Sequence, residues 1–173
     1  FVLEVLQENE AAIKAYERTG FRISRPWDCF QLEGPPRPVD SGRWAIRPIP
    51  VGALEAFAGE LDWLPSWENG LDAIRAVSDE VRLAGAFEGG ACVGVAAWHP
   101  FFRWLMLLVV ARSHRGRGIG SALLDHVLAE AGSEGRPPRA NNVDPADAGL
   151  VHLLERAGFV RFTSQYEMVC DLS

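Results

Sequence analysis

Residues 105–131, LMLLVVARSHRGRGIGSALLDHVLAEA, are the stretch that decides the fold. They open with six apolar residues, Leu105 to Val110, and a short apolar run with β-branched members predicts a strand buried on both faces of a sheet. After a basic, glycine-rich turn, apolar residues recur at helical spacing while Asp125, His126 and Glu130 fall on the opposite face. The sequence therefore predicts a strand, a glycine turn and an amphipathic helix, in that order.

The glycine turn has the features of an anion-binding site. The first backbone N–H groups of a helix have no partner within it, and the helix dipole leaves about half an elementary positive charge there. Gly116, Gly118 and Gly120 have no Cβ, so a ligand can approach the main chain and φ can be positive. Four cationic or titratable side chains lie in the same turn: Arg112, His114, Arg115 and Arg117. Because the net charge of the chain is −6, a small anionic ligand is expected rather than a nucleic acid.

The spacing of the glycines narrows the choice of ligand. A P-loop needs G-x-x-x-x-G-K-[S/T], but the turn has no lysine, and a dinucleotide fingerprint needs a glycine where Ser121 stands. The pattern R-x-x-G-x-G, formed by Arg115, Gly118 and Gly120, does fit. With its flanking strand and helix it resembles the acyl-CoA-binding motif of the GNAT (GCN5-related) N-acetyltransferase superfamily, whose members hold the CoA pyrophosphate on this turn. A solvated glycine-rich connection without a ligand is the alternative.

Length and composition are those of an ordinary globular domain. The chain has 173 residues, of which 48% are hydrophobic and 23% charged. Cys29, Cys92 and Cys170 are too few and too widely spaced for a disulfide framework or a zinc site, so reduced thiols and a cytoplasmic protein are expected. No apolar run approaches the length of a membrane span, and no signal peptide is recognisable. Phe1 begins inside a predicted strand, which indicates that upstream sequence has been left out.

The first 33 residues predict a strand, a helix and a hairpin. The helix runs from Glu10 to Thr19, with Asn9 as its N-cap and Gly20 just past its C-terminus. The strands are expected at residues 1–6, 21–24 and 30–32, the last two forming a hairpin around Pro26. Such a segment cannot close a hydrophobic core by itself.

An internal repeat relates residues 1–33 to the C-terminal part of the chain. When Val5 is superposed on Val143, four further identities appear: Glu17 on Glu155, Arg18 on Arg156, Gly20 on Gly158 and Phe21 on Phe159. The stretch from Val5 to Phe21 also resembles the closing half of a GNAT domain. The chain is therefore interpreted as the C-terminal part of a tandem protein: residues 1–33 are the remnant of a first GNAT unit, 34–42 a proline-stiffened linker, and 43–173 a complete GNAT acetyltransferase domain.

The second unit is predicted to follow the strand and helix order of the superfamily. Strands are expected at residues 44–49, 81–87, 92–98, 105–110, 139–143, 160–163 and 165–172, with Glu88-Gly89-Gly90 as a hairpin turn. Helices are expected at 51–63, 68–76 and 145–157, besides the one after the glycine turn. The resemblance implies an α+β (α/β mixed) fold, with a mixed, mostly antiparallel sheet flanked by helices on both faces and a splayed strand pair for acyl-CoA.

The resemblance also implies the activity and the cofactor site. It implies an acetyl-CoA-dependent N-acetyltransferase that transfers the acetyl group directly to an amine, with the coenzyme in the notch between the strands at 105–110 and 139–143. A backbone N–H near residues 108–110 would stabilise the oxyanion. The residues implied to bind the cofactor are Leu108, Val109, Val110, Arg115, Gly116, Arg117, Gly118, Ile119, Gly120, Ser121 and Asn142.

The catalytic residues are less evident. The family often uses a tyrosine four residues before the closing glycine as the acid; Tyr16 has that place in the partial repeat, but Leu154 has it in the second unit. Tyr166 is the remaining candidate acid, with a half-buried strand aromatic as the alternative. His99 is the preferred candidate base because its reference pKa lies near 6.5. The alternatives are that His99 only ends a strand before Pro100, and that the amine loses its proton through water without a dedicated base. Weaker candidates are Glu88 in the hairpin turn and Asp144, whose alternative role is a helix N-cap. Trp63, Trp67 and Trp98 are candidates for the acceptor pocket or for the core.

Two other functions stay open at this point. The chain could be a non-catalytic acyl-CoA-binding half of a tandem protein, which the missing tyrosine favours, or a structural fragment whose first 33 residues stabilise a dimer. The expected partner is a small-molecule or peptide amine, with neither nucleic acid nor membrane. Pairing into a homodimer or with the upstream unit is open, and the sequence does not identify the amine.

Overall fold

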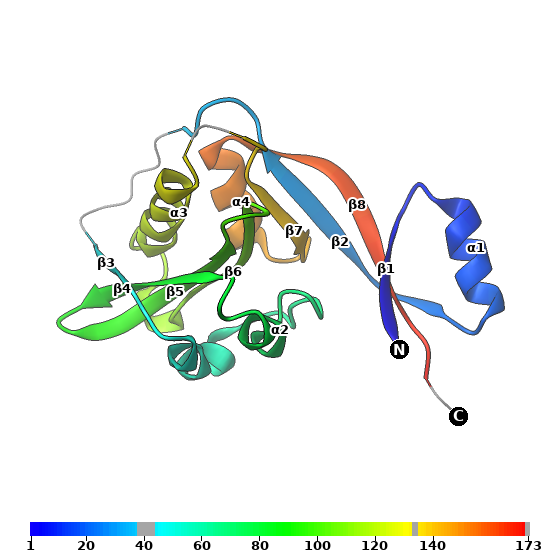
Figure 1. Cartoon of the computed structure of the whole chain (residues 1–173), viewed down its shortest axis with the longest axis horizontal. Helices are drawn as coiled ribbons and strands as arrows, with labels where there is room; N and C mark the ends of the chain where they lie inside the picture. Colours follow the sequence, from blue (N-terminus) through cyan, green and yellow to red (C-terminus); the bar gives the residue numbers. More distant parts are fainter. Residues whose placement is uncertain (38–43, 133–134, 172–173) are drawn as a thin grey trace.

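An eight-stranded sheet forms the centre of the computed structural model, which describes residues 1–37, 44–132 and 135–171 (Figure 1). In chain order, its strands are β1 (Val2–Leu6), β2 (Arg22–Leu32), β3 (Ala45–Pro48), β4 (Arg82–Glu88), β5 (Ala91–His99), β6 (Trp104–Val110), β7 (Arg139–Val143) and β8 (Phe159–Val169). They lie side by side in the order β1-β8-β2-β7-β6-β5-β4-β3. Among the described strand pairs, β6 and β7 run parallel and the others antiparallel. The predicted mixed, mostly antiparallel sheet is confirmed.

Helices cover both faces of the sheet, as predicted. The described helices are α1 (Glu10–Arg18), the 3₁₀ helix η1 (Val51–Glu60), α2 (Leu71–Ala76), the short 3₁₀ helix η2 (Arg112–His114), α3 (Ile119–Ala131) and α4 (Ala148–Ala157). No residue of α1 is buried. On one face, Leu123 of α3 and Leu154 of α4 belong to one hydrophobic core. On the other face, Leu54 of η1 and Ile74 of α2 belong to a second core (Figure 1). The helix-sheet-helix layering explains why the central strands carry apolar side chains on both sides.

The strand, turn and helix predicted from residues 105–131 are confirmed. In β6, Leu105 packs in the core under α3 and α4, whereas Met106 and Val109 pack in the core under η1 and α2. The helix α3 begins after Gly118, which has a left-handed φ of +78°, and it ends at Gly132. Glycine adopts the left-handed conformation without the steric cost that a Cβ imposes, so Gly118 defines where α3 starts.

The hairpin predicted around Pro26 is wrong, because residues 22–32 form the single strand β2. Proline has no N–H to give to a strand ladder, which is why the sequence favoured an interruption there. Up to Trp27, however, β2 has only β8 beside it, and β7 joins on the other side from Asp28 onward. Pro26 therefore lies in a part of β2 that has an open edge, where the missing donor is tolerated.

The hairpin predicted for residues 160–172 is also wrong within the described residues. Phe159 to Val169 form the single strand β8, which pairs with β2 along its whole length and with β1 at its end. The place that the second hairpin strand would have taken is occupied by β2. Strands from both sides of the predicted linker thus form one sheet, and the division of the chain into two units stays a prediction.

Two helices begin or end differently from the prediction. The first helix of the second unit is a 3₁₀ helix that stops at Glu60, in a segment with two glycines and no side-chain N-cap. The last helix begins after Asp147, whose side chain accepts a hydrogen bond from the Leu150 N–H. Asp144, the predicted N-cap, instead accepts from the Ala146 N–H in a turn before the helix.

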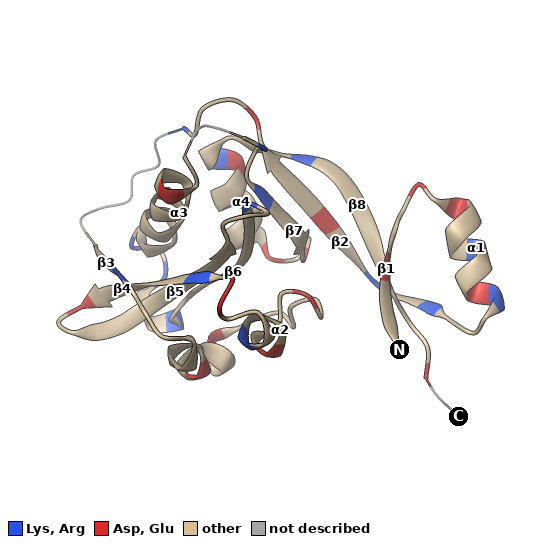
Figure 2. Ribbon diagram, in the orientation of Figure 1, with Lys and Arg blue, Asp and Glu red and all other residues tan. Residues whose placement is uncertain are grey.

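Residues 38–42 of the predicted linker, residues 133–134 of a predicted loop, and Leu172 lie outside the described residues. Within the described residues, no helix is both long enough and apolar enough to cross a membrane. Basic and acidic residues are interspersed over the helices and strands (Figure 2).

The position of β2 in the sheet can be tested by substitution. Phe30 of β2 is 2% exposed and lies in the core under α3 and α4, whereas Phe101, in the turn between β5 and β6, is 81% exposed. Phe30→Ala should lower the free energy of unfolding by about 3–5 kcal/mol. The control Phe101→Ala should change it by less than about 1 kcal/mol. Urea denaturation measures both values, and equal small losses would mean that β2 does not contribute to the core.

Candidate active site

A cleft of about 770 Å³ opens where β6 ends and α3 begins. The turn from His114 to Ser121 forms one wall and α4 forms the opposite wall, with the segment before Trp63 at one end. The residues that line it are Glu60, Leu61, Asp62, Trp63, Leu108, Val109, Val110, His114, Arg115, Gly116, Arg117, Gly118, Ile119, Gly120, Ser121, Asp147, Gly149, Leu150, His152, Leu153 and Arg156. Ten of the eleven residues expected to bind the cofactor therefore lie around one cleft, and the eleventh, Asn142, does not.

A narrower notch adjoins this cleft between β6 and β7. The two parallel strands form a ladder pair only at Trp104 and Arg139, and beyond that pair they separate. The notch has a volume of about 80 Å³, and Asn142 lines it. Leu61, Trp63, Leu108, Asp147 and Leu150 line both the cleft and the notch. The splayed strand pair predicted from the sequence is thus confirmed, and it gives β6 a backbone edge that β7 does not cover.

The glycines of the turn serve different physical purposes. Gly116 has a φ of +74°, and a Cβ placed there would meet no atom within 4 Å, so its surroundings are open. Gly118 supplies the left-handed residue at which α3 begins. At Gly120, a Cβ would lie 3.3 Å from Leu153 Cδ2, so this glycine lets α3 approach α4 closely. Backbone access for a ligand is therefore clearest at Gly116.

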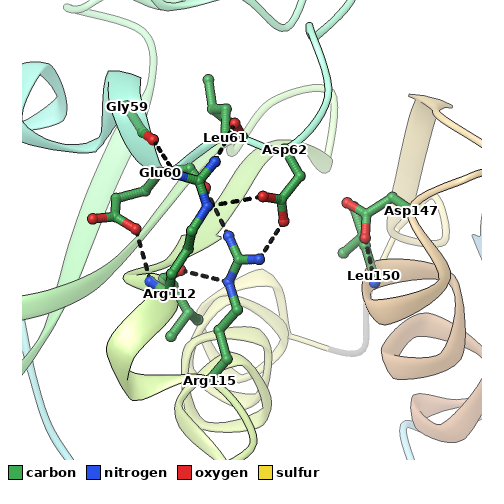
Figure 3. Close-up of polar contacts among 9 residues, drawn as sticks. Gly59, Glu60, Leu61, Asp62, Arg112, Arg115, Asp147 and Leu150 are labelled. Atoms are coloured by element: carbon green, nitrogen blue, oxygen red, sulfur yellow. Dashed lines mark hydrogen bonds and ion pairs between the residues drawn. The ribbon is translucent and has the colours of Figure 1, made fainter.

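Two arginines of the turn hold the segment opposite them instead of facing the cleft as free cations (Figure 3). Arg112 donates to Asp62 at 3.0 Å and to the backbone oxygens of Gly59 and Leu61 at 2.7 and 3.0 Å. Arg115 donates to the other oxygen of Asp62 and to the backbone oxygens of Glu60 and Val110. These two guanidinium groups hold the pKa of the Asp62 carboxyl below its usual range.

Arg117 is likewise engaged, so the basic character expected of the turn is largely neutralised. Its guanidinium pairs with Glu88 and lies 5.2 Å from the ring centre of Trp44. His114 Nε2 lies 3.3 Å from the same carboxylate. Hydrogen bonding to Arg117 lowers the pKa of Glu88. Glu88, which the sequence indicated as a solvated turn residue or a base, therefore pairs with the turn. The donors left for an anion are mainly the backbone N–H groups at the start of α3.

The two predicted catalytic residues lie away from the cleft and the notch. His99 pairs with Trp104 at the start of β6, whereas the cleft lies beyond the end of β6, and its ring contacts Glu80 at 3.2 Å. Tyr166 lies opposite Val5 and Pro26 in the sheet. Because side chains alternate along a strand, Tyr166 points to the other face from its neighbour Glu167. Neither residue enters the mechanism proposed below.

Asn142 lies at a conformationally unusual point of the notch. It is buried and has a left-handed φ of +54° within a strand, which is uncommon for any residue but glycine. Its Nδ2 lies 3.4 Å from Glu4 Oε1 and 3.4 Å from Glu68 Oε2, and its Oδ1 accepts from Cys29 Sγ at 3.9 Å. The sequence did not predict that Glu4, Glu68 or Cys29 lies near Asn142. The pairing of β1 and β2 with β8 brings Glu4 and Cys29 there, and the segment before α2 brings Glu68.

Residues 45–159 match the family model described as the Acetyltransferase (GNAT) family. The chain belongs to this family. Members of this family are acyltransferases that use acyl-CoA. No curated protein sequence matches the chain.

Solved structures share the GNAT fold at low sequence identity. A Drosophila protein is 17% identical with a TM-score of 0.72 and covers 97% of this chain and 60% of its own. A GCN5-related N-acetyltransferase from Sphaerobacter thermophilus is 21% identical with a TM-score of 0.67, over 96% of this chain and 58% of its own. A tandem GNAT protein from the clavulanic acid biosynthesis pathway is 17% identical with a TM-score of 0.59, over 96% of this chain and 62% of its own. The chain spans about three fifths of the length of these structures.

The role of Arg115 as a clamp leads to a prediction. Arg115→Gln should loosen the segment 59–62, because it removes the contacts of Arg115 to Asp62 and to the backbone oxygen of Glu60 and leaves only those of Arg112. Hydrogen-deuterium exchange should then be faster in this segment. Arg156→Gln is the control, since Arg156 lines the same cleft from α4. Unchanged exchange in Arg115→Gln would show that the clamp does not order the segment.

Proposed function

We propose that this chain is an acetyl-CoA-dependent N-acetyltransferase that transfers an acetyl group directly to an amine. The observation that carries the proposal is the cleft at the start of α3 that adjoins a notch between splayed strands. An anionic group at one end and an acyl group at the other would be held by the backbone of a single strand-turn-helix unit. This arrangement fits a long, phosphate-bearing acyl donor better than a compact anion.

The residues present fit such a donor. The backbone N–H groups from Gly116 to Ser121 would hold the pyrophosphate, because the first N–H groups of α3 have no helical partner. The edge of β6 at Leu108, Val109 and Val110 would bind the pantetheine arm, because β7 pairs with β6 only at Trp104. An N–H of the same edge would stabilise the oxyanion of the tetrahedral intermediate. Acetyl-CoA supplies an activated thioester, and the protein supplies position and charge.

Among the described residues that line the cleft, no side chain is an obvious acid for the departing thiolate. Leu154, at the position of the usual tyrosine, is fully buried in the core and does not line the cleft. A thiol has a reference pKa of about 8.5, so a thiolate is a tolerable leaving group without a dedicated acid. Loss of the tyrosine is therefore compatible with slow to moderate turnover.

The alternative is a non-catalytic, acyl-CoA-binding half of a tandem GNAT protein. Leu154 and the neutralised arginines favour it, and so does the internal repeat. One similar structure is itself described as a tandem GNAT protein. We further propose that the acceptor is a small-molecule or peptide amine and that the chain pairs with an upstream unit or with a second copy. The three cysteines are free thiols, which supports a cytoplasmic protein.

Release of CoA, measured over a panel of primary amines with acetyl-CoA, tests the activity. Transfer to at least one amine is the expected result. Calorimetric binding of acetyl-CoA without transfer to any amine of the panel would favour the non-catalytic alternative. Failure to bind acetyl-CoA would exclude both functions.

A matched glycine pair tests the cofactor site. Gly116 and Gly34 have φ values of +74° and +73°, and a Cβ at either meets no atom within 4 Å, but only Gly116 lines the cleft. Valine at either position should cost a similar backbone strain of about 1–3 kcal/mol. Only Gly116→Val should weaken acetyl-CoA binding, by at least about tenfold, because its side chain enters the cleft. Equal affinity in both variants would place the coenzyme elsewhere.

A further inference from the structure

Beside the part of the notch around Asn142 lie two carboxylates that form no ion pair with a cation among the described residues. Glu4 of β1 and Glu68 of the segment before α2 both contact Asn142 Nδ2, so one amide nitrogen lies between them. Trp67 Nε1 donates to the second oxygen of Glu4 at 2.7 Å. The nearby cation, Arg25, forms a two-pronged contact of 3.0 Å with Glu167 instead. Arg25 therefore acts on Glu4 only through its charge, and its ion pair is with Glu167.

Buried polar atoms in the same notch also lack partners. Asn69 is 6% exposed; its Nδ2 donates to the Asn141 backbone oxygen at 2.8 Å, while its Oδ1 has no partner. Trp27 is 1% exposed, and its Nε1 also has no partner. Both residues line the notch. An unpaired buried polar atom costs about 1–3 kcal/mol, so a ligand that gives Asn69 Oδ1 an N–H would recover part of that loss.

The mouth of this end is apolar. Trp63 and Leu64 line the notch and Trp67 lies close to them in sequence; 42%, 76% and 57% of Trp63, Leu64 and Trp67 are exposed. Arg25 fixes their segment to the sheet, since it donates to the backbone oxygens of Leu64 and Pro65 at 2.6 and 3.1 Å. The exposed apolar side chains are thus held in place beside the acidic end of the notch, where they can contact the body of a ligand.

We propose that this end of the notch binds a cationic primary amine carried on an apolar body, and that Glu4 accepts the proton which the amine must lose before acetyl transfer. The inference rests on the acetyltransferase function proposed above and deepens it, because it names the class of acceptor and the base. Glu4 comes from the N-terminal strand, far in sequence from the glycine turn. Asn69 Oδ1 would accept one N–H of the bound amine.

The proposed reaction conserves protons and electrons. The ammonium group gives one proton to a Glu4 carboxylate oxygen and becomes a neutral amine. Its lone pair forms the C–N bond to the acetyl carbon, the C–S bond breaks, and the electron pair leaves with the CoA sulfur. The second amine proton goes to the thiolate, and Glu4 later returns its proton to solvent. The products are an amide, CoA thiol and one released proton.

The surroundings of Glu4 suit a base that works near neutral pH. Burial raises its pKa to about 7, with the charges of Glu68 and Glu167 acting in the same direction. The hydrogen bond from Trp67 and the charge of Arg25 lower it. Burial also raises the pKa of Glu68 and of the nearby Cys29 thiol. Because Glu4 must be ionised to accept a proton, kcat/KM should rise with pH up to about 7 and then level off.

The pH profile of acetyl transfer to 2-phenylethylamine tests the base. In the wild-type chain, kcat/KM should fall about tenfold per pH unit below 7. In Glu4→Gln, kcat/KM should be at least about 100-fold lower, and its fall below pH 7 should disappear. Glu8→Gln, an exposed glutamate of the same segment, should keep both. L-Phenylalanine, which adds a carboxylate to the same body, should be a poorer acceptor. A Glu4→Gln enzyme with the wild-type rate and pH limb would overturn the role of Glu4.

A binding measurement keeps the inference separate from catalysis. In an NMR titration, 2-phenylethylammonium should shift the indole N–H resonances of Trp27 and Trp67 of the wild-type chain. The double variant Glu4→Gln/Glu68→Gln should need at least tenfold higher ligand concentrations for the same shifts. Absence of shifts in the wild-type chain would overturn the acceptor site even if acetyl-CoA binds. Shifts without acetyl-CoA binding would overturn the acetyltransferase function while leaving an amine site. Glutamine is isosteric and retains an oxygen for Trp67, so thermal unfolding should show no loss of stability.

Discussion

The separation of β6 from β7 is the constraint on which the rest of the site depends. A parallel strand pair normally satisfies the backbone groups of both strands, but here the ladder holds a single residue pair, Trp104 and Arg139. The remaining edge of β6 faces a notch, and its polar backbone groups need partners. One end of the notch adjoins the cleft at the start of α3, where further N–H groups are unpaired. The fold thus presents a continuous line of backbone donors and acceptors.

The N-terminal segment contributes to the site as well as to the sheet. The strand β2 fills the place between β7 and β8, and β1 extends the sheet beyond β8 (Figure 1). Through this pairing, Trp27 lines the notch, while Glu4 and Arg25 contact residues that line it. All three come from a part of the chain that the sequence indicated as a remnant. Arg25 ties the segment around Pro65 to the sheet, and Glu4 brings a carboxylate next to Asn142. The segment is therefore integral to the proposed acceptor site.

Local sequence signals predicted the parts of the fold that depend on local physics. The apolar run of β6, the left-handed Gly118 and the periodic apolar face of α3 each act over a few residues, so their structure could be predicted. The position of β2 could not, because a strand can pair with any open edge and Pro26 argued against continuity. The partners of Arg112 and Arg115 could not be predicted either. Asp62 lies far away in sequence, and only the tertiary fold brings it to the turn.

The central claim is that the backbone from β6 into α3 binds acetyl-CoA. A crystal structure of the chain with acetyl-CoA tests it most directly. We expect the diphosphate against the N–H groups of residues 116–121 and the acyl arm along β6 in the notch. A complex with the coenzyme bound elsewhere, or with those N–H groups capped by side chains or water, would contradict the account.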